Sequence, residues 1–335
     1  MSRTALVTGA LGQDGSFLCE LLLGKGYRVV GWGVETPPPA LPWDLPGADF
    51  AYRRLDLRDA EAVERGIAEL APDEVYNLAA LSHVGRSFER PRDVLAVNGD
   101  AVVVLLEALR RHRPEARFFG AASAEVFGSR SGSADELTPM DPVSPYGASK
   151  AYALQMTRIY RHAFGIHASA GIFFNHESER RPESFVTRKI TRAMARIARG
   201  TQERLTLGNV AARRDWGYAP DYVEAAWRML QADEASDYVV ATGEGRRVAD
   251  FVDAAARAAG LELSWEGEGL DTVARDAAGA GRGVGDPKLF RPIHVEVLVG
   301  DAGKARSALD WRPRVGFDAL VARMVEHDLT LESAG

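Results

Sequence analysis

The chain has 335 residues, of which 46% are hydrophobic and 26% are charged, and its formal net charge is −6 at pH 7. This composition predicts a soluble globular protein of one large or two closely packed domains, and its acidic balance gives no basic surface for nucleic acid. Its single cysteine, Cys19, excludes an internal disulfide, and because no apolar run or leader predicts a membrane or secretory segment, we expect a cytoplasmic protein with neither a membrane partner nor a metal site.

A glycine-rich turn follows the first predicted strand, Thr4–Thr8, and precedes a helical pattern that contains Phe17 and Leu21. Its glycines are spaced three residues apart, which allows a tight turn and lets a pyrophosphate approach the amides at a helix N-terminus. A glycine-rich turn without a ligand is the alternative. We predict a dinucleotide site that includes Gly9, Gly12, Gln13, Asp14 and Gly15.

The second predicted strand, residues 27–31, should end beside the adenosine ribose of this nucleotide. Gly33 stands where an acid often holds the 2′-hydroxyl, and Glu35 follows two residues later, so the sequence leaves the choice between NAD and NADP open. Asp56, after the next strand, can accept a hydrogen bond from the adenine amino group. It can equally be a plain turn acid beside a helix capped by Asp59.

Strands and helices continue to alternate through the first half of the chain. The patterns predict a helix over 60–70, a strand over 74–80, a helix over 94–109 and a strand that begins at Arg117. A parallel, doubly wound α/β sheet is the economical topology for this order. His83, at the expected carboxyl edge of the sheet, can touch a substrate or tie down its own backbone.

Two segments carry candidate catalytic groups. Ser123 can donate a hydrogen bond to a substrate oxygen, and Glu125 can remove a proton that a neighbouring carbonyl has acidified. Tyr146 and Lys150 lie four residues apart at the start of a long helix, so their side chains share one face. Because an ammonium group favours a neighbouring phenolate, we expect a lowered pKa for Tyr146 and a role as general base.

The second half of the chain predicts a smaller lobe. We expect residues 1–172 to form mainly the dinucleotide-binding domain and residues 173–335 mainly the substrate lobe, with segments near 203–230 returning to the first domain. The elements expected beside the main sheet are helix 186–199, strand 203–207 and helix 221–231. The segments expected in the smaller lobe are 251–259, 279–285 and 302–309, with 271–285 forming a loop.

The glycine turn, Ser123, Tyr146 and Lys150 together resemble extended short-chain dehydrogenase/reductases. Further segments resemble the GDP-mannose 4,6-dehydratase family over essentially the whole chain, most specifically Asn-His-Glu-Ser at 175–178 and Phe-Val-Thr-Arg-Lys at 185–189. The resemblance implies a Rossmann domain with a smaller carboxyl-terminal lobe. It also implies bound NADP, with NAD as a possibility, a GDP-linked nucleotide-sugar substrate, and a homodimer or homotetramer paired through helices 94–109 and 146–164.

The same resemblance implies residue roles. Tyr146 would take the C4 hydroxyl proton, Lys150 would hold the phenolate and the nicotinamide ribose, Ser123 would bind the C4 oxygen, and Glu125 would remove the C5 proton as water leaves C6. The cofactor residues would be Gly9, Gly12, Gln13, Asp14, Gly15, Asp56, Leu57, Leu78, Ala79, Ala80, Tyr146 and Lys150. The substrate residues would be Ser82, Asn175, Val186, Lys189, Arg214 and Arg291.

Four departures from the family pattern limit these assignments. Ala124 replaces a polar residue, so Glu125 or bound water must protonate the departing hydroxyl. Leu81 replaces a glutamine, and His294 replaces an acid that binds the nucleotide ribose. The segment 34–37, Val-Glu-Thr-Pro, replaces the Arg-Arg-Ser-Ser that holds the 2′-phosphate and reaches a neighbouring subunit, which weakens both the NADP and the tetramer expectation.

Two other functions stay open on the sequence. Ser-Ala-Glu-Val at 123–126 also resembles 4-keto sugar reductases and epimerases of the same fold, whose chemistry needs only Ser, Tyr and Lys. A non-catalytic nucleotide-binding regulatory protein is the second alternative. The presence of Ser123, Glu125, Tyr146 and Lys150 argues against the latter.

Overall fold

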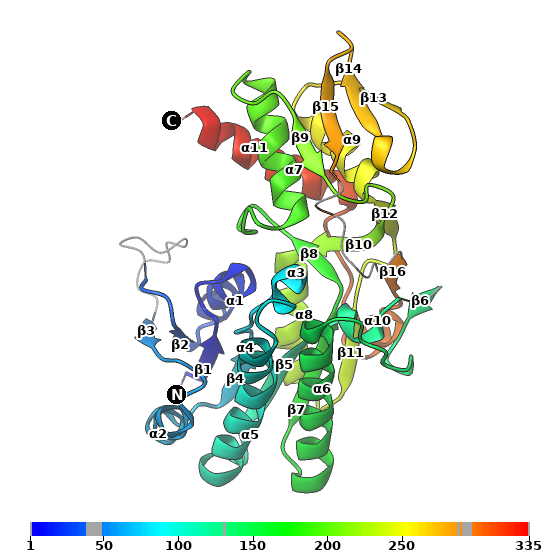
Figure 1. Cartoon of the computed structure of the whole chain (residues 1–335). Coiled ribbons are helices and arrows are strands. Elements are labelled where there is room, and N and C mark those ends of the chain that lie inside the picture. Colours follow the sequence, from blue (N-terminus) through cyan, green and yellow to red (C-terminus); the bar gives the residue numbers. More distant parts are fainter. Residues whose placement is uncertain (1, 38–48, 130–131, 287–288, 290–296, 334–335) are drawn as a thin grey trace.

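A seven-stranded parallel sheet forms the centre of the computed structural model, which describes residues 2–37, 49–129, 132–286, 289 and 297–333 (Figure 1). The strand order is β11-β7-β5-β4-β1-β2-β3. This arrangement confirms the predicted doubly wound α/β fold. The strands are β1 (Thr4–Thr8), β2 (Arg28–Gly33), β3 (Phe50–Arg54), β4 (Glu74–Asn77), β5 (Arg117–Ser123), β7 (Ala168–Phe173) and β11 (Asp237–Val240).

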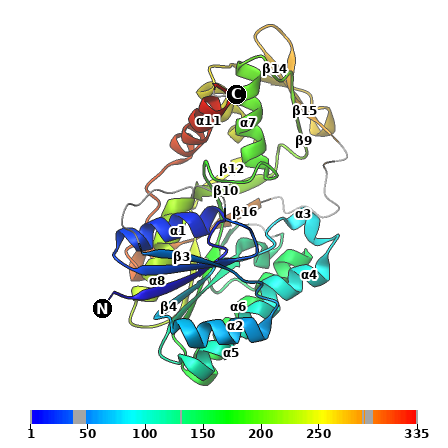
Figure 2. The ribbon, with the colours of Figure 1, turned by 90° about the vertical axis from the view of Figure 1, so that its left-hand side faces the viewer.

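Helices cover both faces of this sheet, as the side view shows (Figure 2). Strands β4 and β7 are buried along their whole length, which is typical of parallel strands packed on both sides. One face carries α1 (Gln13–Gly24), α8 (Ala219–Gln231) and α10 (Gly303–Ala308). The other carries α2 (Ala60–Leu70), α5 (Ala101–His112) and α6 (Pro145–Phe164).

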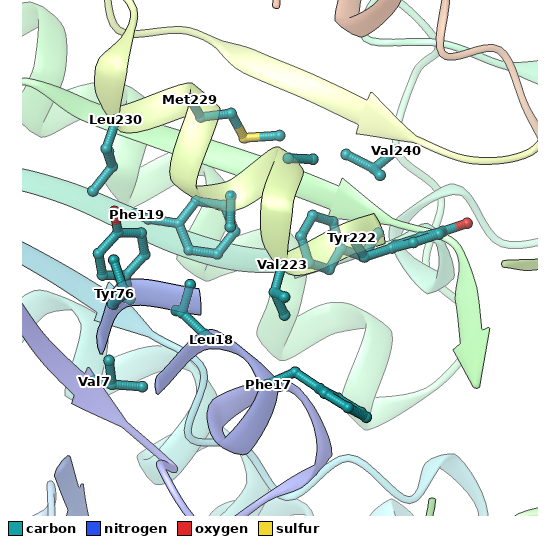
Figure 3. Packing of buried hydrophobic residues seen from close by; sticks show 14 of the residues in the cluster. Val7, Phe17, Leu18, Tyr76, Phe119, Tyr222, Val223, Met229, Leu230 and Val240 are labelled. Atoms are coloured by element: carbon teal, nitrogen blue, oxygen red, sulfur yellow. The ribbon is translucent and has the colours of Figure 1, made fainter. Parts of the chain in front are cut away.

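The core under α1 and α8 sets the position of the glycine turn (Figure 3). Leu18 of α1 and Val223 of α8 pack with Tyr76 of β4 and Phe119 of β5, and all four are at most 1% exposed. Burying such side chains stabilises a fold by roughly 1.5 to 3 kcal/mol each. Because α1 is held against the sheet in this way, its N-terminus stays at the carboxyl end of β1.

Two smaller sheets complete the fold, and all their strands except β6 follow β7 in the chain. A five-stranded sheet contains β6 (Ser133–Ala134), β8 (Asn175–Glu177), β10 (Arg213–Tyr218), β12 (Gly245–Arg247) and β16 (Val297–Gly300). A four-stranded sheet contains β9 (Leu205–Leu207), β13 (Leu263–Glu266), β14 (Val273–Asp276) and β15 (Gly281–Gly285). The helices of this lobe are α7 (Val186–Ala198), α9 (Val248–Ala258) and α11 (Phe317–Ser333), which share one apolar core.

Several expectations for the second half of the chain were wrong. Helix α7 packs on α9 and α11, and β9 pairs with β15, so both belong to the smaller lobe rather than beside the main sheet. Helix α10 packs in the main-sheet core instead of the smaller lobe. Of the segment 203–230, therefore, α8 returns to the main sheet but β9 does not. The domain border near residue 172 stays a prediction.

These errors arise because an amphipathic pattern shows which face of a helix is buried but not which sheet or helix that face packs against. The segment 271–285 forms the antiparallel pair β14 and β15 instead of a loop, because backbone pairing needs few apolar side chains. In the first half, the predicted strand over 74–80 ends at Asn77, and the predicted helix over 94–109 contains a π-helical turn at Ala96–Asp100. No helix in the described ranges is both long enough and apolar enough to span a membrane.

Three short elements lie close to the cleft described below. They are α3 (Val84–Ser87), α4 (Pro91–Leu95) and the 3₁₀ turn η2 (Ala124–Phe127). Helix α3 follows β4, η2 follows β5 directly, and α4 runs into the π-helical turn and α5.

The turn between β1 and α1 requires glycine at position 15. A β-carbon there would collide with the carbonyl oxygen of Gly9 and lie 2.7 Å from Cα of Ala10. We predict that Gly15→Ala lowers the free energy of unfolding by roughly 1 to 3 kcal/mol, the usual cost of forcing extra atoms into a packed site. Chemical denaturation would measure this loss.

Gly24→Ala is the matched control, because it lies on the same helix and its β-carbon would meet nothing within 4 Å. It should leave stability unchanged or raise it by up to about 1 kcal/mol. Equal stability of the two variants would show that the turn at Gly15 can relax without cost.

Candidate active site

A cleft of about 660 Å³ runs along the carboxyl ends of the central strands and is bordered on its other side by the smaller lobe. Residues that follow β1, β2, β3, β4, β5 and β7 all contribute to its wall. Every predicted catalytic, cofactor and substrate residue borders this cleft except Arg291, which lies outside the described residues, as does His294. The structure therefore brings distant parts of the sequence to one place, as expected for this edge of a parallel sheet.

Tyr146 and Lys150 come from the first turns of α6. Ser144 caps this helix by accepting a hydrogen bond from the amide of Gly147 at 3.0 Å, and Pro145 occupies the first helical position. The phenol of Tyr146 shares a hydrogen bond with Ser123, and Nζ of Lys150 donates to the carbonyl oxygen of Ala121 at 2.7 Å. Both contacts tie α6 to the end of β5.

Glu125 is held next to Tyr146 because the backbones of η2 and α6 approach each other closely. Its amide donates to Oγ of Ser123 at 3.3 Å, which caps η2. A β-carbon on Gly147 would lie only 2.6 Å from the carbonyl oxygen of Glu125, so only glycine allows η2 and α6 to approach this closely. Ser123, Glu125 and Tyr146 are thereby fixed relative to one another.

Burial dominates the electrostatics of the two catalytic residues on α6. It raises the pKa of Tyr146 to about 12, and the charge of Glu125 adds to this, while the hydrogen bond with Ser123 opposes it. Burial also lowers the pKa of Lys150 to about 8. The expectation of a lowered pKa for Tyr146 is therefore wrong in this structure, because desolvation outweighs the nearby positive charges and Lys150 donates to a backbone carbonyl.

The wall formed by the glycine turn fits a dinucleotide. Gly12 occupies the N-cap of α1 without a side-chain hydrogen bond, so no side chain covers the first-turn amides. The neighbouring stretch after β4 is fixed by Thr8, whose Oγ accepts from the amides of Leu78 at 3.2 Å and Ala79 at 3.1 Å. Leu78, Ala79 and Ala80 line the cleft together with Leu57.

The end of β2 carries a negative charge at the predicted ribose position. Oε2 of Glu35 lies 2.8 Å from the point where a β-carbon on Gly33 would stand, and Oη of Tyr52 lies 2.6 Å from the same point. Tyr52 also donates to the carbonyl oxygen of Glu35 at 3.1 Å. The carboxylate thus stands where NAD-binding proteins of this topology place an acid.

The three arginines near this position all have other partners. Arg53 pairs with Glu69 at 3.2 Å, and Arg54 donates to the carbonyl oxygen of Val34 at 2.9 Å. Arg58 pairs with Asp56, and the hydrogen bonds from Arg58 hold the pKa of Asp56 below its usual range. Asp56 also accepts from the amide of Arg58 at 3.0 Å, as a turn acid does, and it still borders the cleft.

Four side chains from the smaller lobe, three of them polar, border the same cleft. Asn175 lies on β8, Val186 and Lys189 on the first turns of α7, and Arg214 on β10. Burial lowers the pKa of Lys189, and the charge of Asp286 opposes this effect. Their convergence on one wall is the arrangement predicted for substrate binding, and the individual roles stay predictions.

The segment after β4 also reaches the cleft. Ser82 borders it, and Nδ1 of His83 accepts a hydrogen bond from the amide of Arg86 at 3.2 Å. His83 therefore caps α3. This agrees with the second of the two roles predicted from the sequence, in which the side chain binds its own backbone. Its ring also lies 5.7 Å from that of Phe185.

Two cleft residues were given no role from the sequence. His176 contacts Asp14 at 2.8 Å, and Arg181 pairs with Glu177 at 3.0 Å while it lies 3.7 Å above the ring of Phe185. The motif 175–178 marked this region, but nothing in its spacing indicated a partner in the glycine turn. Across the described ranges, no group of three or more His, Cys, Asp or Glu side chains is arranged to hold a metal ion.

Solved structures share this fold. The structure of a Thermus thermophilus UDP-glucose 4-epimerase in complex with NAD is 28% identical, with a TM-score of 0.81 over 97% of this chain and 98% of that one. The structure of RMD from Pseudomonas aeruginosa with NADPH is 22% identical, with a TM-score of 0.78 over 98% of this chain and 100% of that one, and shows the fold alone.

Comparison with sequences identifies the family. The family model described as GDP-mannose 4,6 dehydratase matches residues 6–324. GDP-mannose 4,6 dehydratase 2 of Arabidopsis thaliana is 45% identical over 98% of this chain and 87% of its own length. GDP-mannose 4,6-dehydratase of Vibrio cholerae is 42% identical over 98% of this chain and 94% of its own length. The chain belongs to the GDP-mannose 4,6-dehydratase family.

Proposed function

We propose that this protein is a lyase that converts GDP-mannose, or a close GDP-sugar, to the GDP-4-keto-6-deoxy sugar with the help of tightly bound NADP or NAD. The observation that carries the proposal is the convergence of Ser123, Glu125, Tyr146 and Lys150 beside a dinucleotide-type glycine turn. Membership of the dehydratase family supplies the substrate class. A cytoplasmic location is part of the proposal.

The first step oxidises C4 of the sugar by removing the proton of its hydroxyl group and the hydride of its C–H bond. Tyr146 accepts the hydroxyl proton as general base, while Ser123 binds the C4 oxygen and keeps it in reach. A bound nicotinamide dinucleotide would supply the acceptor for the C4 hydride and later the donor for C6, so that the whole reaction is redox-neutral. Lys150, whose Nζ donates to the carbonyl oxygen of Ala121 in this structure, would hold the phenolate and the nicotinamide ribose once substrate and cofactor are bound.

The second step uses the ketone formed at C4. The ketone acidifies the proton on C5, Glu125 removes that proton, and the C6 hydroxyl leaves as water. Ala124 carries no proton donor, so Glu125 itself, once protonated, or a bound water protonates the leaving group. A hydride then enters at C6 and a proton returns to C5, which completes the 4-keto-6-deoxy product.

A 4-keto reductase or epimerase is the competing function of the same fold, and Ala124 between Ser123 and Glu125 is the feature that favours it. The two functions differ in their need for an external reductant. A dehydratase turns over GDP-mannose without added NADPH, whereas a reductase consumes one NADPH for each product. Incubating the purified protein with GDP-mannose alone and analysing the nucleotide sugars by mass spectrometry tests the proposal.

The assembly that we propose is a homodimer at least, formed through α5 and α6. Tyr152 and Ile159 lie seven residues apart on α6, hence on one face, and are 40% and 48% exposed. Leu95, at the end of the adjacent α4, is 44% exposed. Exposed apolar side chains on neighbouring helices are typical of a subunit interface. The segment 34–37 does not favour the further contact of a tetramer.

The elimination step depends on the carboxylate of Glu125. We predict that Glu125→Gln still oxidises C4 and still binds the cofactor but releases no 4-keto-6-deoxy product, because an amide cannot take the C5 proton. The measurement is uptake of solvent deuterium at C5 together with product release.

Glu136→Gln, in the segment that follows η2, is the control. Its side chain accepts from the amide of Val239 at 2.7 Å, which an amide oxygen can also do, so turnover should be unchanged. Wild-type product formation by Glu125→Gln would remove Glu125 from the mechanism.

The oxidation step depends on the phenol of Tyr146. We predict that Tyr146→Phe loses turnover by about 10²- to 10⁴-fold, the usual contribution of a general base, and keeps its affinity for the nucleotide sugar. In the wild type, kcat should rise with pH, because only the deprotonated phenol accepts a proton and its pKa is raised to about 12 in this structure.

Tyr152→Phe removes a hydroxyl on the face of α6 that we propose as a subunit contact, outside the lining of the cleft; because the apolar ring is kept, this variant should behave like the wild type. Single-turnover reduction of the cofactor separates this step from product release. If Tyr146→Phe reduced its cofactor at the wild-type rate, the assignment of the base would be wrong.

The cofactor preference follows from the charges at the end of β2. Because Glu35 repels a 2′-phosphate and the nearby arginines are engaged elsewhere, we predict dissociation constants for NADP and NAD within about tenfold of each other, or about 1.4 kcal/mol. Glu35→Gln should shift the ratio toward NADP. Titration of the apo-protein with each cofactor measures both.

Glu61→Gln, at an exposed position of α2, is the matched charge control and should leave the ratio unchanged. Binding of NADP tighter by roughly a hundredfold, about 2.7 kcal/mol, would mean that cations from another segment or subunit hold the phosphate.

A further inference from the structure

Asp14 and His176 join the first turn of α1 to β8 at the wall of the cleft. Oδ2 of Asp14 lies 2.8 Å from Nε2 of the histidine, and Nδ1 of the same ring lies 2.7 Å from the carbonyl oxygen of Phe174. The imidazole stacks on Tyr222 with ring centroids 4.7 Å apart and meets the ring of Phe173 edge-on at 5.4 Å. Two hydrogen bonds and two aromatic rings therefore fix its orientation.

The partners of the ring define its protonation. A carbonyl oxygen only accepts hydrogen bonds, so Nδ1 of His176 must carry a proton. A carboxylate also only accepts, so Nε2 carries a second proton whenever Asp14 is ionised. An imidazole with both nitrogens protonated is a cation. This geometry describes an imidazolium–carboxylate pair.

The surrounding charges agree with this description. Burial by itself lowers the pKa of His176, but the charge of Asp14 and its hydrogen bond outweigh burial and raise it. Burial raises the pKa of Asp14, but His176, with help from the hydrogen bond of Gln13 and the charge of Arg181, outweighs burial and lowers that pKa. The other titratable groups around the pair are Glu177 at the end of β8, Arg181 after it, Tyr222 on α8, and Tyr146 and Lys150 on α6.

The carboxylate of Asp14 is also close enough to act on the catalytic residues. Burial lowers the pKa of Lys150, and the charge of Asp14 opposes this; the same charge adds to the raised pKa of Tyr146. A carboxylate without a counter-charge at this place would disfavour the phenolate that the reaction needs. The imidazolium supplies the counter-charge.

We propose that His176 is a positioning residue that, as an imidazolium, fixes Asp14 in the glycine turn and offsets its charge, so that Tyr146 can act as a base. The proposal rests on the proposed function, because it concerns the base of that reaction. Neither Asp14 nor His176 needs to contact the reacting atoms. The pair thereby links the dinucleotide wall to the proton-transfer step.

A second ion pair joins the same two segments and provides a control. Nη2 of Arg180 lies 2.6 Å from Oε1 of Glu20, and Nη1 donates to Oγ of Ser16 at 3.1 Å. Arg180→Gln breaks this mechanical connection between α1 and the segment after β8. It changes no charge in the Asp14–His176 pair.

The pH dependence of kcat separates a charge role from a mechanical one. The profile rises as Tyr146 loses its proton. In His176→Gln, the uncompensated carboxylate should move this rising limb to higher pH by roughly one unit, because it raises the pKa of Tyr146. The double variant Asp14→Asn/His176→Gln has no charge at either position and should return the rising limb to its wild-type position. Arg180→Gln should leave the rising limb in place.

Nuclear magnetic resonance of the ¹⁵N-histidine-labelled protein, with its bound nucleotide, tests the ion pair without turnover. At pH 7.5, both ring nitrogens of His176 should carry a bonded proton in the wild type, and the ring should be neutral in Asp14→Asn. The signal is assigned by its loss in His176→Gln.

A neutral His176 ring in the wild type would overturn the proposal, as would equal pH shifts in His176→Gln and Arg180→Gln or a shift that persists in the double variant. These outcomes are distinct from failure of the proposed function. If Tyr146→Phe retained turnover, the role of the base would be lost, whereas the protonation state of His176 would stand.

Discussion

Apolar cover on both faces of the central sheet is the constraint on which the site depends. Between the sheet and its covering helices a polar side chain loses its hydration, so it needs a hydrogen-bond partner, as the hydroxyl of Thr157 on α6 has in the carbonyl oxygen of Ala153. Side chains that must stay available to a ligand therefore belong at the ends of the strands. At the carboxyl end, the strands deliver a glycine turn, Ser123 and Glu125 to one cleft, and α6 adds Tyr146 and Lys150.

Within that cleft, desolvation competes with charge. Burial makes the phenol of Tyr146 a weaker acid and the ammonium of Lys150 a stronger one, so their proximity in sequence does not by itself produce an activated base. Arg181, whose charge lowers the pKa of Tyr146, and His176 come from a different segment, which comprises β8 and the residues that follow it. Activation is thus a property of the assembled cleft, to which both lobes contribute.

Because both lobes contribute to the cleft, only part of the site could be predicted from the sequence. Local signals such as the glycine turn and the four-residue spacing of Tyr146 and Lys150 predicted elements and placed them at the correct edge of the sheet. Partners distant in sequence were not predictable, because an apolar stripe such as that of α7 fits any apolar core. The contact between Asp14 and His176 was not predictable for the same reason, since nothing in the sequence indicates that residues 162 positions apart are in contact.

The return of late segments to the first sheet has a consequence for synthesis of the chain. Strand β11 forms an edge of that sheet, and Ala305 of α10 is fully buried in the same core as Leu18. A ribosome delivers residues from the N-terminus onward, so the glycine turn emerges long before the segments that complete its support. The nascent dinucleotide domain must therefore expose part of its core until the last tenth of the chain is being made.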